Sequence, residues 1–135
     1  MKIGTVVQLH HDAKRRHWIA SAQLVGENDV RVYDSAKRAD SDSRPVLSPC
    51  VHTQLQDIYG DTCNITFPLM SQQMNGVDCG LYAIAAITDI CYGRDPSDRQ
   101  YVWESNTMRR HLIGCMLDGI LSPFPAVLRQ KSSNV

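Results

Sequence analysis

Alternation of apolar and polar residues dominates the first third of the chain and predicts β-strands there. Three runs show this two-residue period, at residues 5–10, 18–25 and 30–34. Residues 26–29 (GEND) separate the second run from the third and are typical turn residues. We therefore expect two of these runs to form an antiparallel hairpin.

A first helix is expected in the middle of the chain. Residues 36–44 are polar and indicate an exposed loop, after which Ser48 and Pro49 suit the N-cap and the first position of a helix. The pattern predicts a helix over residues 50–59, and Gly60 is suited to end it.

A further strand and a buried helix follow. Residues 63–70 (CNITFPLM) favour a strand, although Pro68 argues against full ladder pairing in the centre of a sheet. Residues 81–91 (LYAIAAITDIC) are apolar on nearly every side, which is typical of a buried helix, and Gly93 stands where a C-cap is expected.

The last predicted helix runs over about residues 107–121. Its apolar residues fall on one stripe, which we expect to dock onto the core: Met108, Leu112, Cys115, Met116 and Ile120. Beyond it, residues 126–135 end in polar side chains and are expected to form a flexible tail. Residues 1–125 are then one domain.

The composition is that of an ordinary globular protein. The chain has 135 residues, 43% of them hydrophobic and 21% charged, with a formal net charge of zero. We expect no nucleic-acid partner from this charge, and the longest apolar stretch is too short to span a bilayer. The amino terminus alternates like a strand and lacks the form of a signal sequence, so we expect an intracellular protein, nuclear or cytoplasmic.

The five cysteines show none of the close pairing that marks disulfide frameworks or zinc knuckles, which fits a reducing compartment. Cys50 and His52, with His10 and His11, could form a metal site, but the short spacing CVH is a weak signal and we expect no metal and no cofactor. Four of the cysteines are expected to be small buried apolar residues: Cys50, Cys63, Cys91 and Cys115.

Cys79 differs from the other cysteines because it stands at the predicted start of the buried helix, in the run NGVDCGL. In the first turn of a helix the unpaired backbone N–H groups and the positive end of the dipole favour an anion. This position is suited to a nucleophilic thiolate. The ordinary alternative is one more buried thiol.

A nucleophilic cysteine needs a base and a group that orients the base, and His17 and Asp34 are the candidates. They stand at the ends of two neighbouring strands. They share a face in any antiparallel register that pairs odd-numbered with even-numbered residues. Direct opposition needs a tight loop at residues 25–26, a turn centred on residues 27–28 shifts the pair, and a bulge could reconcile the two. A surface histidine and a turn-initiating acid are the alternatives.

Acyl transfer also needs hydrogen-bond donors for the developing oxyanion. The backbone N–H of Cys79 is one candidate. Gln73, six residues earlier, could bring its side-chain amide to the same place, and Gln72 competes for this role. A solvated loop amide is the alternative for Gln73.

Taken together, these residues resemble the Ulp/sentrin-specific type of ubiquitin-like-modifier cysteine proteases. The matching motifs are HW at residues 17–18, VYDS at residues 32–35 and QMNGVDCGLYAIA at residues 73–85. Later matches, MRRHL at residues 108–112 and FP at residues 124–125, resemble family members that are encoded by mobile elements or derived from them. The order of the motifs, His, Asp, Gln, Cys, is that of the family.

The resemblance implies an α+β fold, with a mostly antiparallel sheet packed against the central buried helix that starts at the nucleophile. It makes Cys79 the nucleophile, His17 the general base and acid, Asp34 the residue that orients His17, and Gln73 an oxyanion donor. The implied reaction cleaves the peptide or isopeptide bond after the C-terminal glycine of a ubiquitin-like modifier through a thioester. Trp18 would flank the groove for the modifier's Gly-Gly tail, unless it is a core aromatic facing away from His17.

Two other functions are weighed against this one. Family catalytic domains usually carry a substantial segment ahead of the histidine, whereas sixteen residues precede His17 here. This difference motivates a catalytically silent module that keeps the fold and binds a modifier. A viral-type thiol protease that processes a polyprotein is the third hypothesis.

Overall fold

The structure is a computed structural model, and it describes residues 4–36, 47–97 and 101–128. Most of the expected loop over residues 36–44 and the end of the expected tail, residues 129–135, lie outside the described residues.

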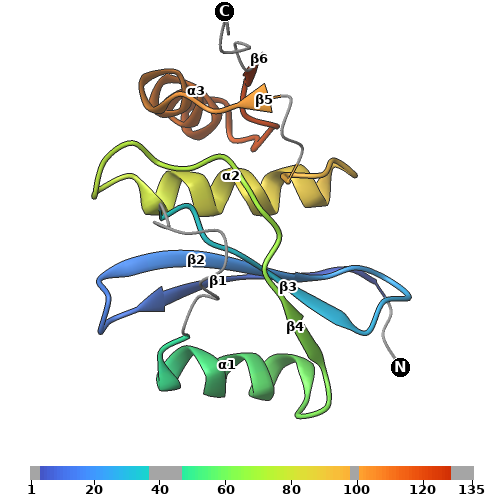
Figure 1. Cartoon of the computed structure of the whole chain (residues 1–135). Helices are drawn as coiled ribbons and strands as arrows, with labels where there is room; N and C mark the ends of the chain where they lie inside the picture. Colours follow the sequence, from blue (N-terminus) through green and yellow to red (C-terminus); the bar gives the residue numbers. More distant parts are fainter. Residues whose placement is uncertain (1–3, 37–46, 98–100, 129–135) are drawn as a thin grey trace, which may run out of the picture.

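A four-stranded sheet forms the middle of the molecule (Figure 1). Its strands, in spatial order, are β1 Val6–Asp12, β2 His17–Gln23, β3 Asp29–Tyr33 and β4 Asn64–Thr66. β1 pairs with β2 and β2 with β3 in antiparallel fashion, whereas β4 adds to β3 in parallel. The three strands expected in the first third are confirmed, and so is the mostly antiparallel sheet.

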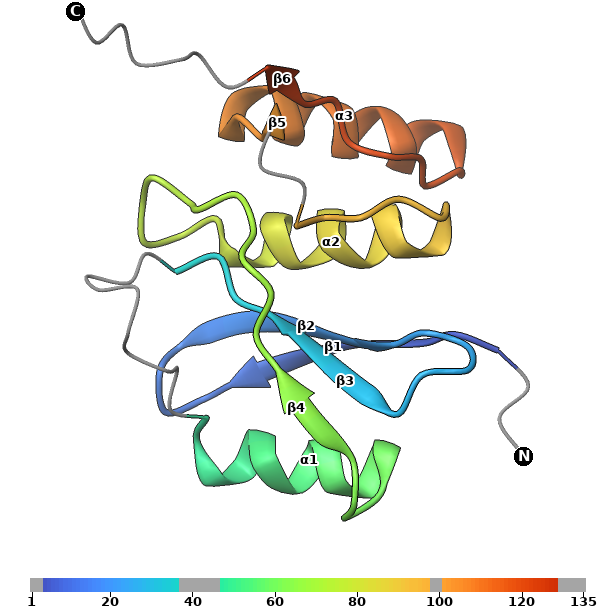
Figure 2. The same ribbon diagram turned by 45° about the vertical axis from the view of Figure 1, so that its right-hand side comes forward.

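Three helices are stacked with the sheet in layers. Helix α1 (Pro49–Tyr59) covers one face, and α2 (Cys79–Cys91) covers the other (Figures 1 and 2). Helix α3 (Ser105–Asp118) lies on the far side of α2, next to the short pair β5 (Tyr101–Val102) and β6 (Val127–Leu128). Helix α2 is therefore enclosed between the sheet and α3, which explains why it is apolar on nearly every side.

Each face of the sheet has its own hydrophobic core, because side chains along a strand alternate between faces. The core under α1 consists mainly of branched aliphatic residues, among them Ile19, Val30, Val32, Val51 and Leu55. The core under α2 contains small residues from both sides: Ala20, Ala22, Ala83, Ala85 and Ala86. Small side chains on both elements allow α2 to pack closely on β2, next to the start of that strand.

The ends of the helices follow the sequence signals, with one change at α1. Ser48 is the N-cap residue of α1, but its hydroxyl donates to Oδ2 of Asp12 at 2.6 Å and does not cap the helix. Gly93 has a φ of 75°, and it donates to the carbonyl of Ile90 while Arg94 donates to that of Asp89. This is a Schellman motif, which ends α2 as Gly93 predicts.

Two expectations about packing are wrong. The predicted strand over residues 63–70 is shorter, because β4 ends at Thr66, before Pro68. The stripe on the last helix docks only in part: Met108 is buried, but Met116 and Ile120 are 76% and 66% exposed. Helix α3 is the outer layer, so only one narrow side of it faces α2, and β6 occupies the first residues of the expected tail.

The cysteines are also less uniformly buried than expected. Cys115 is buried and Cys63 is intermediate, whereas Cys50 and Cys91 are exposed. Cys50 lies in the first turn of α1 and Cys91 ends α2, and each side chain points away from the face that its helix buries. In the described parts of the chain, no helix combines the length and hydropathy that a membrane span requires.

Candidate active site

His17 and Asp34 form a buried pair at one end of the sheet. Nε2 of His17 and Oδ1 of Asp34 are 2.6 Å apart. A carboxylate only accepts hydrogen bonds, so Nε2 donates. Nδ1 of the same ring is then the nitrogen left to exchange a proton with another group.

The register of β2 with β3 explains the pair. Ala20 lies opposite Tyr33 and Ser21 opposite Val32, so odd-numbered residues pair with even-numbered ones, as the shared face of His17 and Asp34 requires. The centre of the turn lies between the two alternatives considered from the sequence, a tight loop at residues 25–26 and a turn centred on residues 27–28. Continued along the strands, this register sets residue 36 opposite His17, so Asp34 lies two residues short of direct opposition. The contact between the two side chains is therefore diagonal.

Asp34 is held as a carboxylate. Burial alone would raise its pKa, but the hydrogen bonds from His17 and from the Ala36 N–H, together with the nearby positive charges, lower the pKa to about 2. Arg15, on the turn between β1 and β2, donates to the second oxygen, Oδ2, at 3.1 Å. Asp34 thus keeps its negative charge over the whole pH range in which a histidine titrates.

Cys79 is the first residue of α2 and is 6% exposed. Its Sγ accepts a hydrogen bond from the backbone N–H of Trp18, 3.4 Å away, which brings the helix start against the residue that follows His17. Among the described residues, no hydrogen bond joins Sγ to the His17 ring. Such contacts are often loose in unliganded enzymes and tighten when substrate binds.

Gln73 lies in the loop that leads to α2 and is buried. Its backbone N–H donates to the carbonyl of Ser35 at 2.9 Å, and its Oε1 accepts from the Ser35 hydroxyl at 2.6 Å. Nε2 donates to the carbonyl of Asn75 at 2.5 Å, and its second N–H remains for another acceptor. Gln72 instead donates to the carbonyls of Asp34 and Met70, so the two glutamines have different contacts.

Trp18 is not a core residue, since it is 41% exposed. Its indole lies against the ring of His11, with 4.7 Å between centroids. On the other side it approaches Gly80, where an added Cβ would lie 3.8 Å from the indole. The structure therefore places Trp18 at the surface beside the start of α2.

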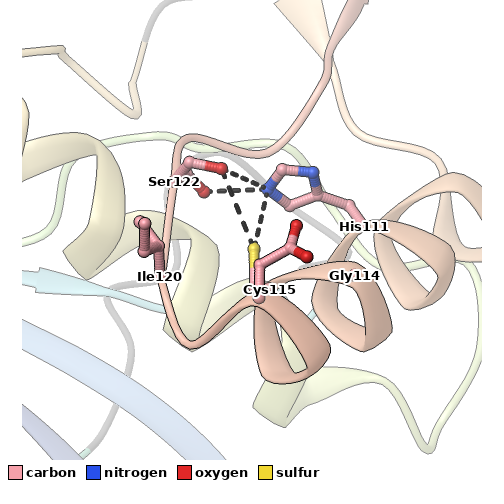
Figure 3. Close-up of a pocket in the computed structure, with 6 residues that line it drawn as sticks. His111, Gly114, Cys115, Ile120 and Ser122 are labelled. Atoms are coloured by element: carbon pink, nitrogen blue, oxygen red, sulfur yellow. Dashed lines mark hydrogen bonds between the residues drawn. The ribbon is translucent and has the colours of Figure 1, made fainter.

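A second cysteine–histidine pair lies on α3 and lines a cavity of about 320 Å³ (Figure 3). Sγ of Cys115 is 3.4 Å from Nε2 of His111, but that nitrogen is also 2.9 Å from the carbonyl oxygen of Ser122. Because a carbonyl oxygen only accepts, Nε2 already carries a proton and cannot take one from the thiol. Cys115 also lies in the last turn of α3, where the helix dipole disfavours an anion. Contact with a histidine alone does not make this cysteine a nucleophile.

Several residues of the site were not singled out from the sequence. Arg15 belongs to the basic run before His17 and contacts Asp34. Ser35 holds Gln73. Asp78, next to Cys79, is bonded to Arg109 of α3, a contact between residues that are far apart in the chain. Adjacency to Cys79 was the one sequence signal that could have pointed to Asp78.

Comparison with solved structures finds this fold in SUMO protease Ulp1. The structure of Ulp1 with its catalytic cysteine oxidised to a sulfenic acid matches with a TM-score of 0.63 and 17% identity, over 86% of this chain and 53% of that chain. The C-terminal Ulp1 protease domain in complex with Smt3, the yeast ortholog of SUMO, matches with a TM-score of 0.52 and 18% identity, over 69% and 43%. No family model and no curated protein matches the sequence. The expected α+β fold is confirmed, and the chain spans about half the length of the Ulp1 chains it matches.

Proposed function

We propose that the protein is a cysteine-type peptidase or isopeptidase that cleaves after the C-terminal glycine of a ubiquitin-like modifier. The observation that carries this proposal is the meeting of two elements within an Ulp1-like fold. The start of α2, with Cys79, contacts the start of β2, where His17 is paired with Asp34.

The residues divide the chemistry between them. Nδ1 of His17 takes the proton of the Cys79 thiol, and the thiolate attacks the carbonyl carbon of the terminal glycine. His17 then protonates the leaving amine as the C–N bond breaks, and a thioester remains on Cys79. Water, deprotonated by His17, hydrolyses the thioester and releases the modifier. Asp34 holds the ring and stabilises its positive charge during both steps.

The oxyanion that forms on the glycine carbonyl needs donors in place before the reaction. The backbone N–H of Cys79 provides one, and the free N–H of Gln73 Nε2 provides the second. The bond from Nε2 to the Asn75 carbonyl and the bond from Ser35 to Oε1 fix the orientation of this amide. Losing one such donor typically costs about 2.7 to 4 kcal/mol of transition-state stabilisation.

The substrate class follows from the chemistry of the tail. A Gly-Gly tail has no side chains and passes through a slot too narrow for other residues, and the exposed Trp18 beside Gly80 would form one wall of it. A solved Ulp1 domain that shares this fold is in complex with the modifier Smt3, which supports a partner of the same kind here. The expected location remains intracellular.

The test is covalent labelling by a panel of modifiers, ubiquitin and its relatives, each with a C-terminal electrophile. The wild-type chain should form an adduct with at least one of them, and Cys79→Ala should form none while retaining its circular dichroism spectrum. Cys115→Ala is the matched control, since it removes the other histidine-bonded cysteine and should label like wild type.

The outcomes separate the alternatives. A folded wild-type chain that no probe labels would end the proposal. If Cys79→Ala still binds a modifier that the wild type does not cleave, the silent binding module is correct. Cleavage of peptide libraries without glycine before the scissile bond would support a polyprotein-type protease.

A further inference from the structure

Asp78 occupies the N-cap position of α2 and yet does not cap the helix. An aspartate at this position normally accepts a hydrogen bond from the second or third N–H of the helix. Here Oδ2 accepts from Nδ2 of Asn75 at 2.7 Å, and Oδ1 is bonded to Nη2 of Arg109. The side chain of Asp78 is 4% exposed, and a hydrogen bond from Ser105, at the start of α3, also lowers its pKa. These donors hold the carboxylate away from the helix amides.

The first turn of α2 is therefore left open. The first backbone hydrogen bond of the helix runs from the N–H of Tyr82 to the carbonyl of Asp78, at 3.2 Å. The three N–H groups before it, of Cys79, Gly80 and Leu81, have no side-chain acceptor among the described residues. These are the amides that a thiolate or an oxyanion at Cys79 would use.

A capping carboxylate would compete with both anions. It would occupy one of the amides and place a negative charge beside Cys79, which disfavours ionisation of the thiol. The guanidinium of Arg109, from the neighbouring layer α3, instead holds this charge and partly balances it. The contact joins α3 to the start of α2, the two layers stacked in Figure 2.

We propose that Arg109 is a positioning residue, which with Asn75 and Ser105 keeps the Asp78 carboxylate off the N-terminus of α2 and so reserves the first-turn amides for the Cys79 thiolate and the oxyanion. The part that concerns the oxyanion rests on the proposed function. The part that concerns the thiolate does not, because alkylation of Cys79 reports it directly.

The test measures the rate of Cys79 alkylation by iodoacetamide against pH, with the site read by mass spectrometry so that the other cysteines do not interfere. Arg109→Gln releases Oδ1 of Asp78 and removes the positive charge that balances the carboxylate, and it is expected to raise the pH midpoint of alkylation by about half a unit to one unit. Arg110→Gln is the matched control, since it removes the next arginine of the same helix and should leave the midpoint unchanged. Thermal unfolding checks that each variant is folded.

A double variant separates electrostatics from simple docking of α3. Arg109→Gln with Asp78→Asn removes the freed charge, so its midpoint should return toward the wild-type value. If Arg109 only attaches α3 to α2, the single variant leaves the midpoint unchanged, and either that result or a double variant without recovery overturns the proposal. Two charged or titratable groups from the sheet, His17 and Asp34, also face this helix end and are present in every variant.

Hydrolysis of a modifier carrying a C-terminal fluorophore gives the second readout. Arg109→Gln should lower kcat about tenfold with little change in KM, because the amides act mainly on charge that develops in the transition state. If the alkylation midpoints shift as expected but no modifier is hydrolysed, the proposed function is wrong while the role of Arg109 stands. If hydrolysis is present and the midpoints do not move, the role of Arg109 is wrong while the proposed function stands.

Discussion

Each end of helix α2 has a buried aspartate, and the pKa values of the two are shifted in opposite directions. At the amino-terminal end burial would raise the pKa of Asp78, but hydrogen bonds from Asn75, Ser105 and Arg109 lower it. At the carboxy-terminal end Asp89 is 9% exposed, and its carboxylate makes no hydrogen bond among the described residues. Burial is the main reason why the pKa of Asp89 rises to about 6. Donors, and not burial alone, decide whether a carboxylate remains ionised at neutral pH.

This difference in pKa distinguishes the end of the helix that takes part in the proposed chemistry from the end that does not. At its amino-terminal end the Asp78 carboxylate is already bonded, so in the described part of the chain no side-chain acceptor competes with Cys79 for the first-turn amides. At its carboxy-terminal end, burial disfavours the ionised form of Asp89, and the proposed chemistry does not use this carboxylate. Substitutions near both ends of the helix test this contrast.

The largest effect is expected from His17→Ala, which removes the proposed base. Without a group that moves the proton, kcat/KM for modifier hydrolysis should fall by at least about 10³-fold, as in other enzymes that lose a member of a catalytic triad. His52→Ala, on the exposed side of α1, is the control and should hydrolyse at the wild-type rate. A loss smaller than tenfold for His17→Ala would mean that another group supplies the base.

Asp34→Asn should reduce both activity and stability. The pKa of Asp34 is about 2 in the folded chain, against an ordinary value of 3.8, so the carboxylate stabilises the fold above about pH 4 and this contribution is lost as pH falls towards 2. Urea unfolding at pH 7 should show a loss of about 2 kcal/mol, which shrinks on acidification. A loss that is independent of pH would show that packing, and not charge, is responsible.

Asp89→Asn should change the stability in the opposite direction. The pKa of about 6 means that the folded chain holds this proton more tightly than the unfolded chain, so ionisation lowers stability as pH rises from about 4 to 6. The variant should be more stable than wild type by about 1 to 2 kcal/mol at pH 7.5 and about equal to it at pH 4. Asp57→Asn, at an exposed position of α1, should change stability by less than about 0.5 kcal/mol.

Arg15→Gln should give the smallest effect. Arg15 contacts the second oxygen of Asp34, but its side chain is 33% exposed, and such ion pairs typically contribute about 1 kcal/mol or less. We expect a loss below about 1 kcal/mol in urea unfolding, with salt reducing the difference from wild type. A loss as large as that of Asp34→Asn would make Arg15 an essential support of the pair.

Much of the local structure could be predicted from the sequence. The strands of the first third, the start of α1 and the start and end of α2 follow from short-range patterns, namely the two-residue alternation, the N-cap pair Ser48 and Pro49, and Gly93. The outer side of α3 could not be predicted in this way. Met116 and Ile120 have helical spacing, but whether a second layer covers them depends on how the helices stack.

The residues of the candidate site could be predicted from the sequence, but their spatial arrangement could not. Cys79, His17 and Asp34 were proposed because of residue type and position at element ends, and the structure brings His17 and Asp34 into contact and Cys79 against Trp18. Their register could not be chosen from the sequence, because several turns fit residues 25–28. The catalytic roles remain predictions that the labelling experiment tests.

By itself the sequence determined which segments form helices and strands and placed a cysteine at a helix start, because backbone preferences and capping act over a few residues. The tertiary structure alone decided the state of the charges around that helix. Arg109 reaches Asp78 from thirty-one residues away, whereas among the described residues no side chain donates to the Asp89 carboxylate, and only the charge of Arg94 lowers its pKa. Burial and charge pairing depend on groups that are distant in the chain, so the ionisation that the proposed chemistry requires is a property of the folded molecule.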